Sequence, residues 1–252
     1  MNSATVRSLL LRGMLVGLAA GLVAFALSYL LGEPPLRAAL VFEEAHSTDP
    51  GPEAVSRAMQ ESVGLATGVL VFATALGGIA ALAYCFALGR IGRFGARATA
   101  ALVAGGAFVT IGLVPFLKYP ANPPAVSDPA TLNQRTALYV LMIALSVLLG
   151  SAAVIVGKRL APRHGNWNAT VRAGVGYLAA VTLAMVLLPN VDEMPDGFPV
   201  SVVWDFRLAS LAVQAGLWAA FGLLFGAAAE RLLEPRTPAT AGARAVGEPS
   251  AG

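Results

Sequence analysis

Six long stretches of the chain carry almost no charged side chains. Each is about 18 residues or longer, the length that an α-helix needs to cross the roughly 30 Å hydrocarbon core of a bilayer. Charged residues occupy 12% of the 252 positions, against about 25% in an ordinary soluble domain. The sequence therefore predicts an all-α, polytopic membrane protein with one six-helix transmembrane domain over residues 1–233, with spans at about 8–31, 61–88, 98–117, 136–157, 171–188 and 206–229.

The last segment of the chain, residues 234–252, has a different composition. It consists mostly of Pro, Ala, Gly, Thr and Arg, with too little apolar surface to form a core. We expect a disordered tail.

The basic residues are distributed unevenly between the two sets of loops. Six spans place both termini on the same side, and 12 of the 17 Lys and Arg residues fall at the termini or in the second and fourth loops. Because Lys and Arg accumulate on the cytoplasmic side of membrane proteins, both termini and the tail are predicted to be cytoplasmic. Eleven of the 14 acidic residues then lie outside, where they either attract cations or simply form a solvated surface.

The third span ends in a proline-rich run, Val114 to Pro124. Proline lacks a backbone donor and disfavours helix in the preceding residue, so this run predicts a loop at the membrane surface. Lys118 and Tyr119 suit the headgroup level, since their polar ends can reach water from an apolar stem. With Asn122, and with Asp192 and Glu193 from the fifth loop, they are our candidates for the mouth of an ion path, Lys118 being paired with an outer acid.

The first outer loop contains the sharpest candidate for metal contact. Glu43, Glu44 and His46 place two carboxylates and an imidazole within four residues. Such ligands suit Co²⁺, Ni²⁺ or Zn²⁺, and in a helix Glu43 and His46 would share one face. A solvated loop with no bound ion is the competing interpretation.

The predicted spans offer few polar groups. Gln214 is the deepest strongly polar side chain, and it either bonds to another helix or lines a path. GxxxG patterns occur at Gly13, Gly17 and Gly21, at Gly64 and Gly68, and at Gly222 and Gly226. They predict close helix contacts, either within the chain or in a homo-oligomer.

Several function classes lack their minimal sequence elements. The chain has no GxxxxGK[ST], HExxH or GxSxG motif, so we expect no enzyme activity and no bound cofactor. Its formal charge of +3 comes from helix flanks rather than from a basic stripe, which argues against nucleic-acid binding. The single cysteine, Cys85, provides no disulfide or CxxC pair.

Several motifs together resemble the CbtA family of predicted cobalt transporter subunits, in its actinobacterial form, over roughly Arg7 to Leu233. They are Glu43-Glu44-Ala45-His46, Ser62-Val63-Gly64-Leu65-Ala66-Thr67-Gly68, Pro115-Phe116-Leu117-Lys118-Tyr119-Pro120-Ala121-Asn122-Pro123-Pro124, Arg135-Thr136-Ala137-Leu138-Tyr139, Trp167-Asn168-Ala169-Thr170, Val191-Asp192-Glu193, Gly197-Phe198-Pro199 and Phe206-Arg207-Leu208-Ala209-Ser210.

This resemblance implies an integral subunit of a divalent-metal uptake system in the inner membrane. The transported ion would be Co²⁺ for cobalamin synthesis, and the expected partner is a small one-helix CbtB-like subunit with a histidine-rich end. Relatives often carry further histidines where this chain reads Ser47 to Pro52, so ion capture by this loop would be weak. The alternative is a membrane scaffold or partner-binding subunit that does not itself transport, which the uncharged helix interiors favour.

Overall fold

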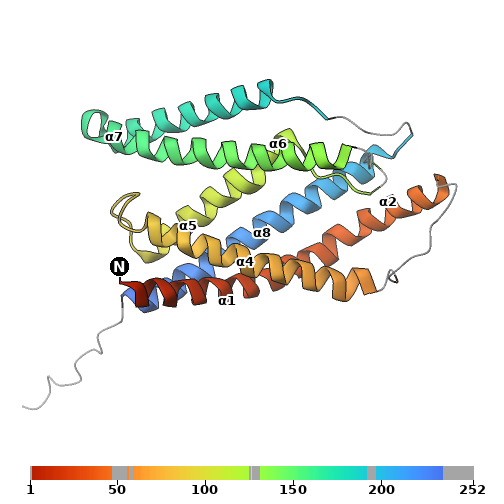
Figure 1. The fold of residues 1–252 in the computed structure, drawn as a ribbon, viewed down its shortest axis with the longest axis horizontal. Coiled ribbons are helices and arrows are strands. Elements are labelled where there is room, and N and C mark those ends of the chain that lie inside the picture. Colours follow the sequence, from red (N-terminus) through yellow and green to blue (C-terminus); the bar gives the residue numbers. More distant parts are fainter. Residues whose placement is uncertain are drawn as a thin grey trace, which may run out of the picture.

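Long helices arranged side by side account for nearly all of the chain in the computed structural model, which describes residues 2–46, 56, 59–124, 126, 131–191 and 197–234 (Figure 1). No strand occurs among these residues, which confirms the all-α prediction. The elements are α1 (Ser3–Leu27), η1 (Ser28–Gly32), α2 (Glu33–His46), η2 (Gln60–Gly64), α4 (Leu65–Ala87), α5 (Ala96–Ala107), η3 (Phe108–Leu113), α6 (Val114–Lys118), α7 (Leu132–Leu187) and α8 (Val200–Leu233), where η denotes a π-helix.

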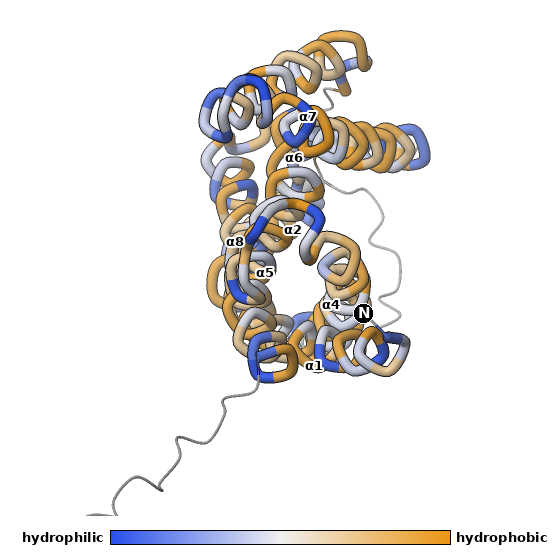
Figure 2. The backbone as a smooth tube through the Cα atoms, turned by 90° about the vertical axis from the view of Figure 1, so that its left-hand side faces the viewer, coloured by the Kyte–Doolittle hydropathy of each residue, from blue (hydrophilic) through white to orange (hydrophobic). Residues whose placement is uncertain are grey.

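Five continuous helical stretches are long and apolar enough to cross a membrane. They are Ser3–Ala45, Gln60–Ala87, Ala96–Lys118, Leu132–Leu187 and Val200–Leu233. Figure 2, which looks along the bundle, shows hydrophobic colour on much of every helix together with some hydrophilic turns. The fold is therefore that of a multi-pass membrane protein.

The 56-residue helix α7 turns back on itself at Gly165. This glycine has φ 75° and ψ 158°, outside the helical region, and glycine adopts positive φ without steric cost. The limbs 132–164 and 166–187 lie side by side in Figure 1, and the hydroxyls of Ser146 and Tyr177 are hydrogen-bonded at 2.9 Å between them. The turn falls in the basic stretch where the sequence predicts a boundary between two spans.

The first helix extends further than the sequence suggests. A loop is expected from Gly32 onward, but α2 continues the helix to His46. Pro34 and Pro35 follow the π-helix η1, and a proline ring clashes with the carbonyl four residues earlier, here Leu30 and Leu31. The π turn is wider at those two carbonyls, so the proline rings fit there and the helix continues. Pro115 likewise follows a π-helix, η3. The residue four positions before it, Ile111, lies within that π-helix.

Two pairs of helices pack through small residues. The glycines of α1 face α4, where a Cβ added at Gly13 would stand 2.7 Å from the carbonyl oxygen of Gly77. Gly222 and Gly226 of α8 face α5 in the same way, and a Cβ at Gly222 would stand 2.9 Å from the Ala104 Cβ. These two GxxxG faces therefore pack within the chain.

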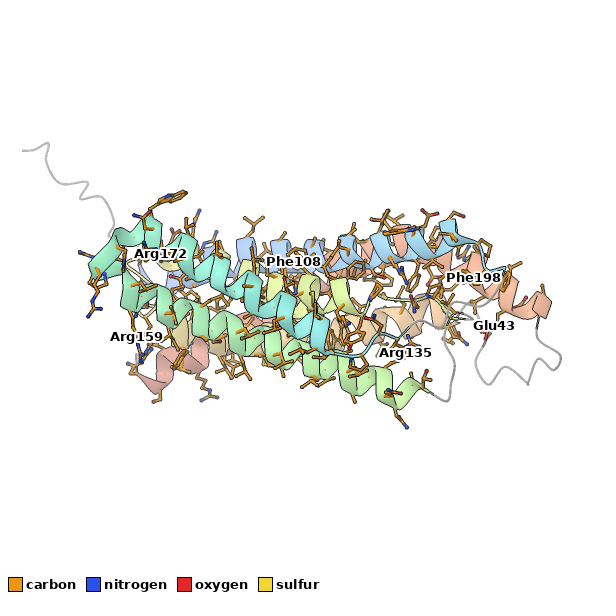
Figure 3. The ribbon with its side chains drawn as sticks, turned by 90° about the horizontal axis from the view of Figure 1, so that it is seen from above. Glu43, Phe108, Arg135, Arg159, Arg172 and Phe198 are labelled. Carbon is orange, nitrogen blue, oxygen red and sulfur yellow. The ribbon has the colours of Figure 1, made fainter. Side chains whose placement is uncertain are left out.

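Charged side chains lie near the two ends of the bundle. Figure 3 places Arg159 and Arg172 at one end and Glu43 and Arg135 at the other. We call the first the basic end; it also contains the N-terminus and the ion pair between Arg97 and Glu230 at 2.7 Å. We call the other the proline-loop end, after residues Tyr119–Pro124.

Replacing Gly17 by leucine tests whether the contact between α1 and α4 holds the fold together. A Cβ at this position would overlap the Ala73 carbonyl oxygen and stand 3.0 Å from the Gly77 Cα. Such overpacking costs about 1–3 kcal/mol, so the melting temperature in detergent should fall by several degrees. Gly174→Leu is the matched control, because no atom of the described residues lies within 4 Å of a Cβ there. An equal fall in both variants would show that the close contact is not decisive.

Candidate functional site

The proline loop is tied to the end of α7. The Tyr119 hydroxyl donates a hydrogen bond to the Pro189 carbonyl oxygen at 2.9 Å, and Lys118 Nζ donates one to Asn190 Oδ1. Burial raises the pKa of the Tyr119 phenol, so it remains a neutral donor at physiological pH. Lys118 also lies over the Tyr119 ring, 5.7 Å from its centroid. The hydrogen-bond partner shown for Lys118 is thus an amide rather than the acid expected from the sequence.

A second contact joins the proline loop to α8. Arg207 Nη2 donates a hydrogen bond to Asn122 Oδ1 at 2.8 Å, and its guanidinium lies 6.0 Å from the centroid of the Trp204 ring. Hydrogen bonds from a charged donor are stronger than neutral ones. Asn122 is therefore held in a fixed position between the loop and the helix.

A partly open cavity of about 350 Å³ adjoins these contacts and is lined by η3, α6, the proline loop, the start of α7 and α8. Two guanidinium groups, Arg135 and Arg207, lie in its wall, and none of its described residues carries a carboxylate. The lining residues are Gly112, Phe116, Tyr119, Pro120, Ala121, Asn122, Val126, Leu132, Arg135, Thr136, Tyr139, Val191, Arg207, Ser210, Leu211 and Gln214.

Gly112 and Gln214 are the lining residues of η3 and α8 that lie furthest along these helices from the proline loop. A Cβ added at Gly112 would stand 3.8 Å from the Gln214 Cβ and 3.9 Å from Oε1. The Gln214 side chain is partly exposed and forms part of the cavity lining. Gly112 belongs to the π-helix η3, and π turns inside longer helices occur frequently at functional sites.

The predicted metal contacts lie apart from this cavity, at the end of α2. Glu43 and Glu44 are exposed, and the helical backbone places Glu43 and His46 three residues apart on one face. Phe42 packs on Phe198 with ring centroids 4.8 Å apart, which holds this end of α2 near the start of α8. Among the described residues no three His, Cys, Asp or Glu side chains group as a metal site. Asp192 and Glu193 lie outside those residues.

Comparison with known families identifies the chain. A family model described as "Probable cobalt transporter subunit (CbtA)" matches residues 6–230. The protein belongs to the CbtA family. No curated protein and no solved structure matches it. Because the family match spans every described helix from α1 to α8, the cavity and the end of α2 both belong to the CbtA-family region.

Sequence reasoning missed one polar cluster in this CbtA-family protein. Arg37 of α2 forms a forked pair with Glu61 of η2, with Nε–Oε1 at 3.0 Å and Nη2–Oε2 at 2.6 Å. The carboxylate of Glu33, which is 5% exposed, lies 4.0 Å from Arg37 Nε. The spacing of Glu33 and Arg37 at i and i+4 would have indicated this cluster if the segment had been predicted as helix.

Substitution of Asn122 tests whether the hydrogen bond from Arg207 fixes the proline loop. Asn122→Ala removes the acceptor and should cost about 1.5–3 kcal/mol, measured as a lower melting temperature in detergent. Asn122→Asp keeps an acceptor and should retain most of the stability. The control is Asn133→Ala, since that asparagine is exposed in the first turn of α7. If both alanine variants melt alike, the loop does not depend on this bond.

Proposed function

We propose that this protein is the membrane-embedded subunit of a divalent-metal uptake system, with cobalt as the transported ion and cobalamin synthesis as its destination. The observation that carries the proposal is the CbtA family match over residues 6–230, described as a probable cobalt transporter subunit. The polar cavity at the proline-loop end supports it, because it provides a binding site at one end of an otherwise apolar helix bundle.

We further propose that the chain crosses the inner membrane six times, with both termini in the cytoplasm. The turn at Gly165 supports two crossings for α7, since a straight 56-residue helix would be about 84 Å long. The basic end, with Arg159 and Arg172, then faces the cytoplasm according to the positive-inside rule. In this orientation the cavity and the end of α2 face the outer side.

In the proposed mechanism the outer acids raise the local concentration of cations. Glu43, Glu44 and His46 make a weak first contact, which suits transit because a passing ion must also be released. The ion then enters the cavity beside Asn122. Gln214, the lining residue of α8 furthest from the proline loop, marks where the path enters the bundle.

A subunit needs a partner, and we propose a small one-helix protein of CbtB type with a histidine-rich end. Two GxxxG faces, on α1 and α8, are already used within the chain. Among the described residues, nothing lies within 4 Å of a Cβ at Gly68, and at Gly64 the nearest atom is the carbonyl oxygen of Met59 in the same helix. We therefore expect a partner helix, or a second copy of the chain, to dock on the face that contains Gly64 and Gly68.

The second candidate function is a scaffold that supports a transporting partner. It is favoured by the composition of the helix interiors: residues 62–89, 98–117, 136–157 and 208–229 contain no charged side chain. Ion-conducting helices commonly place ionisable groups in the membrane interior. Cobalt uptake by cells with and without this chain separates the two functions.

Uptake of radioactive cobalt at limiting concentration tests both the function and the first contact. Cells with the chain and its partner should accumulate more cobalt than cells lacking the chain. Glu43→Ala, Glu44→Ala and His46→Ala combined should lower uptake severalfold at unchanged protein level, because the outer ligands are lost. Equal uptake with and without the chain would favour the scaffold. Full uptake by the triple variant would remove these residues from the mechanism.

Epitope tags at the two ends of the chain test the orientation. Both tags should react with antibody only after the cells are permeabilised, since both termini are placed inside. A tag inserted after Pro52, in the outer loop, should react in intact cells and serves as the positive control. Reaction of the terminal tags in intact cells would reverse the proposed entry side.

A further inference from the structure

The turn of the α7 hairpin is strongly basic. The chain contains no Asp or Glu from residue 131 to residue 191. Around Gly165 this stretch contains four exposed cationic side chains, Lys158, Arg159, Arg163 and Arg172. The ion pairs and side-chain hydrogen bonds formed among the described residues involve none of these four. Their charge is therefore not balanced within the part of the protein that the structure describes.

Close packing of the two limbs gathers these charges into one cluster. A Cβ added at Gly157 would stand 3.3 Å from the Ala173 Cβ, so the limbs touch beside the turn. Arg172 immediately precedes this contact on the second limb, and Figure 3 shows it at the same end of the molecule as Arg159 of the first limb. Arg163 follows Arg159 by four residues, a spacing that places both on one helix face. The cluster thus draws on both limbs.

Exposed apolar side chains continue from the cluster along both limbs. Val154, Ile155 and Val156 precede it on the first limb, and Val175 and Leu178 follow it on the second. In a membrane protein such side chains contact the acyl chains of lipids. A surface that is cationic at its end and apolar beside that end matches the two parts of a phospholipid, the anionic headgroup and the acyl chains.

Trp167 lies within the turn itself, between the cations of the two limbs. Its side chain is 79% exposed, so it does not contribute to a packed core. Tryptophan accumulates at the membrane–water interface, where the ring contacts acyl chains and the N–H reaches the headgroups. A soluble anion such as free phosphate would need the cations alone, whereas a lipid headgroup also accounts for the position of this ring.

The core contacts of the hairpin lie at its other end. Met142 and Val181, one from each limb, pack with Val114 of α6. Within the fully described helix α7, Ala169 is the one buried residue between 147 and 180, and its carbonyl oxygen lies 3.9 Å from a Cβ added at Gly157 on the other limb. The turn therefore packs mainly on itself, and a bound lipid would hold it at the membrane surface.

We propose that the turn of the α7 hairpin binds an anionic phospholipid. Its phosphate lies among Lys158, Arg159, Arg163 and Arg172, since the guanidinium fork suits phosphate oxygens. Its acyl chains lie along the exposed apolar residues of the limbs, and Trp167 packs at headgroup level. Clusters of four or more Lys and Arg beside a membrane helix commonly bind anionic lipids. The inference goes beyond the proposed function, because it requires only that this turn lie at a membrane surface.

The preference of basic residues for the cytoplasmic side explains the sign of the charge at this turn. It predicts no selectivity between lipids of equal chain length and no special role for these four residues among the arginines of the basic end. Selective binding that depends on this cluster therefore separates a lipid site from a topological signal.

Fluorescence quenching of the purified full-length protein in neutral detergent tests the inference. The probes are phosphatidylglycerol and phosphatidylcholine, both brominated in the acyl chains and titrated as a fraction of the micelle. Phosphatidylglycerol should quench saturably, with half-saturation at a fraction about tenfold lower than for phosphatidylcholine. Trp167→Phe should remove most of this selective quenching, because that ring lies in the proposed site. Equal quenching by the two lipids would overturn the inference.

Substitution of the cluster identifies the site. Lys158→Gln, Arg159→Gln, Arg163→Gln and Arg172→Gln combined should raise the half-saturating fraction of phosphatidylglycerol about tenfold. The matched control combines Arg7→Gln, Arg90→Gln, Arg93→Gln and Arg231→Gln, which removes four charges from other segments at the basic end and should leave binding unchanged. Equal weakening by the two sets would show that binding follows overall charge, and it would overturn the inference.

Melting temperatures without added lipid show which variants fold. If the fourfold cluster variant does not fold, Arg163→Gln combined with Arg172→Gln, one from each limb, decides and should weaken binding severalfold. Unchanged binding in a folded cluster variant would contradict the proposal.

Inorganic phosphate and glycerophosphoglycerol, a headgroup without acyl chains, distinguish a lipid from a soluble anion. At millimolar concentration and matched ionic strength, neither should displace brominated phosphatidylglycerol, because neither contacts the apolar side chains of the limbs. Displacement by inorganic phosphate would assign the cluster to a soluble anion and reject the lipid site.

Discussion

The fold depends on close contact between helix backbones. Lipid is as apolar as the side chains, so burying leucine between helices gains little in a membrane, and association relies on van der Waals contact between smooth surfaces. The glycine face of α1 against α4, and Gly222 of α8 against α5, provide such contact at distances where a methyl group would not fit. Between these pairs the stacked rings of Phe221 and Phe225, with Tyr84 edge-on to Phe225, fill the wider gap.

The π-helical turns show how prolines are tolerated inside long helices. Pro34, Pro35 and Pro115 each follow a π turn containing the carbonyl that their rings would otherwise strike. At η3 the same distortion borders the cavity, since Gly112 lies in that turn opposite Gln214. The π turn that accommodates Pro115 thus also provides part of the cavity lining.

Hydropathy and charge predicted much of this fold because both depend on short stretches of sequence. The helical class and the five long apolar stretches follow from runs of apolar residues, and the turn at Gly165 falls in the basic stretch between two of the predicted spans. The extension of the first helix to His46 could not be predicted, because Pro34 and Pro35 normally indicate a helix end and the π turn that accommodates them has no clear sequence signal. Gln214 and Asn122 were candidates by polarity alone. Their common cavity was not, because it also needs Arg135 and Arg207, which line one cavity only once α7 and α8 both pack against η3.

The hairpin formed by α7 has a consequence for how the cavity is built. Its limbs are fastened to the rest of the molecule chiefly at α6 and η3, where Val114 packs with Met142 and Val181, and most of its remaining surface faces outward. The first limb also carries Arg135 and Tyr139, which form one wall of the cavity, whereas Arg207 and Gln214 lie on α8 in the opposite wall. Neither limb takes part in the glycine contacts of α1 with α4 and of α8 with α5, so the cavity lies between two parts of the fold that are held together by different contacts.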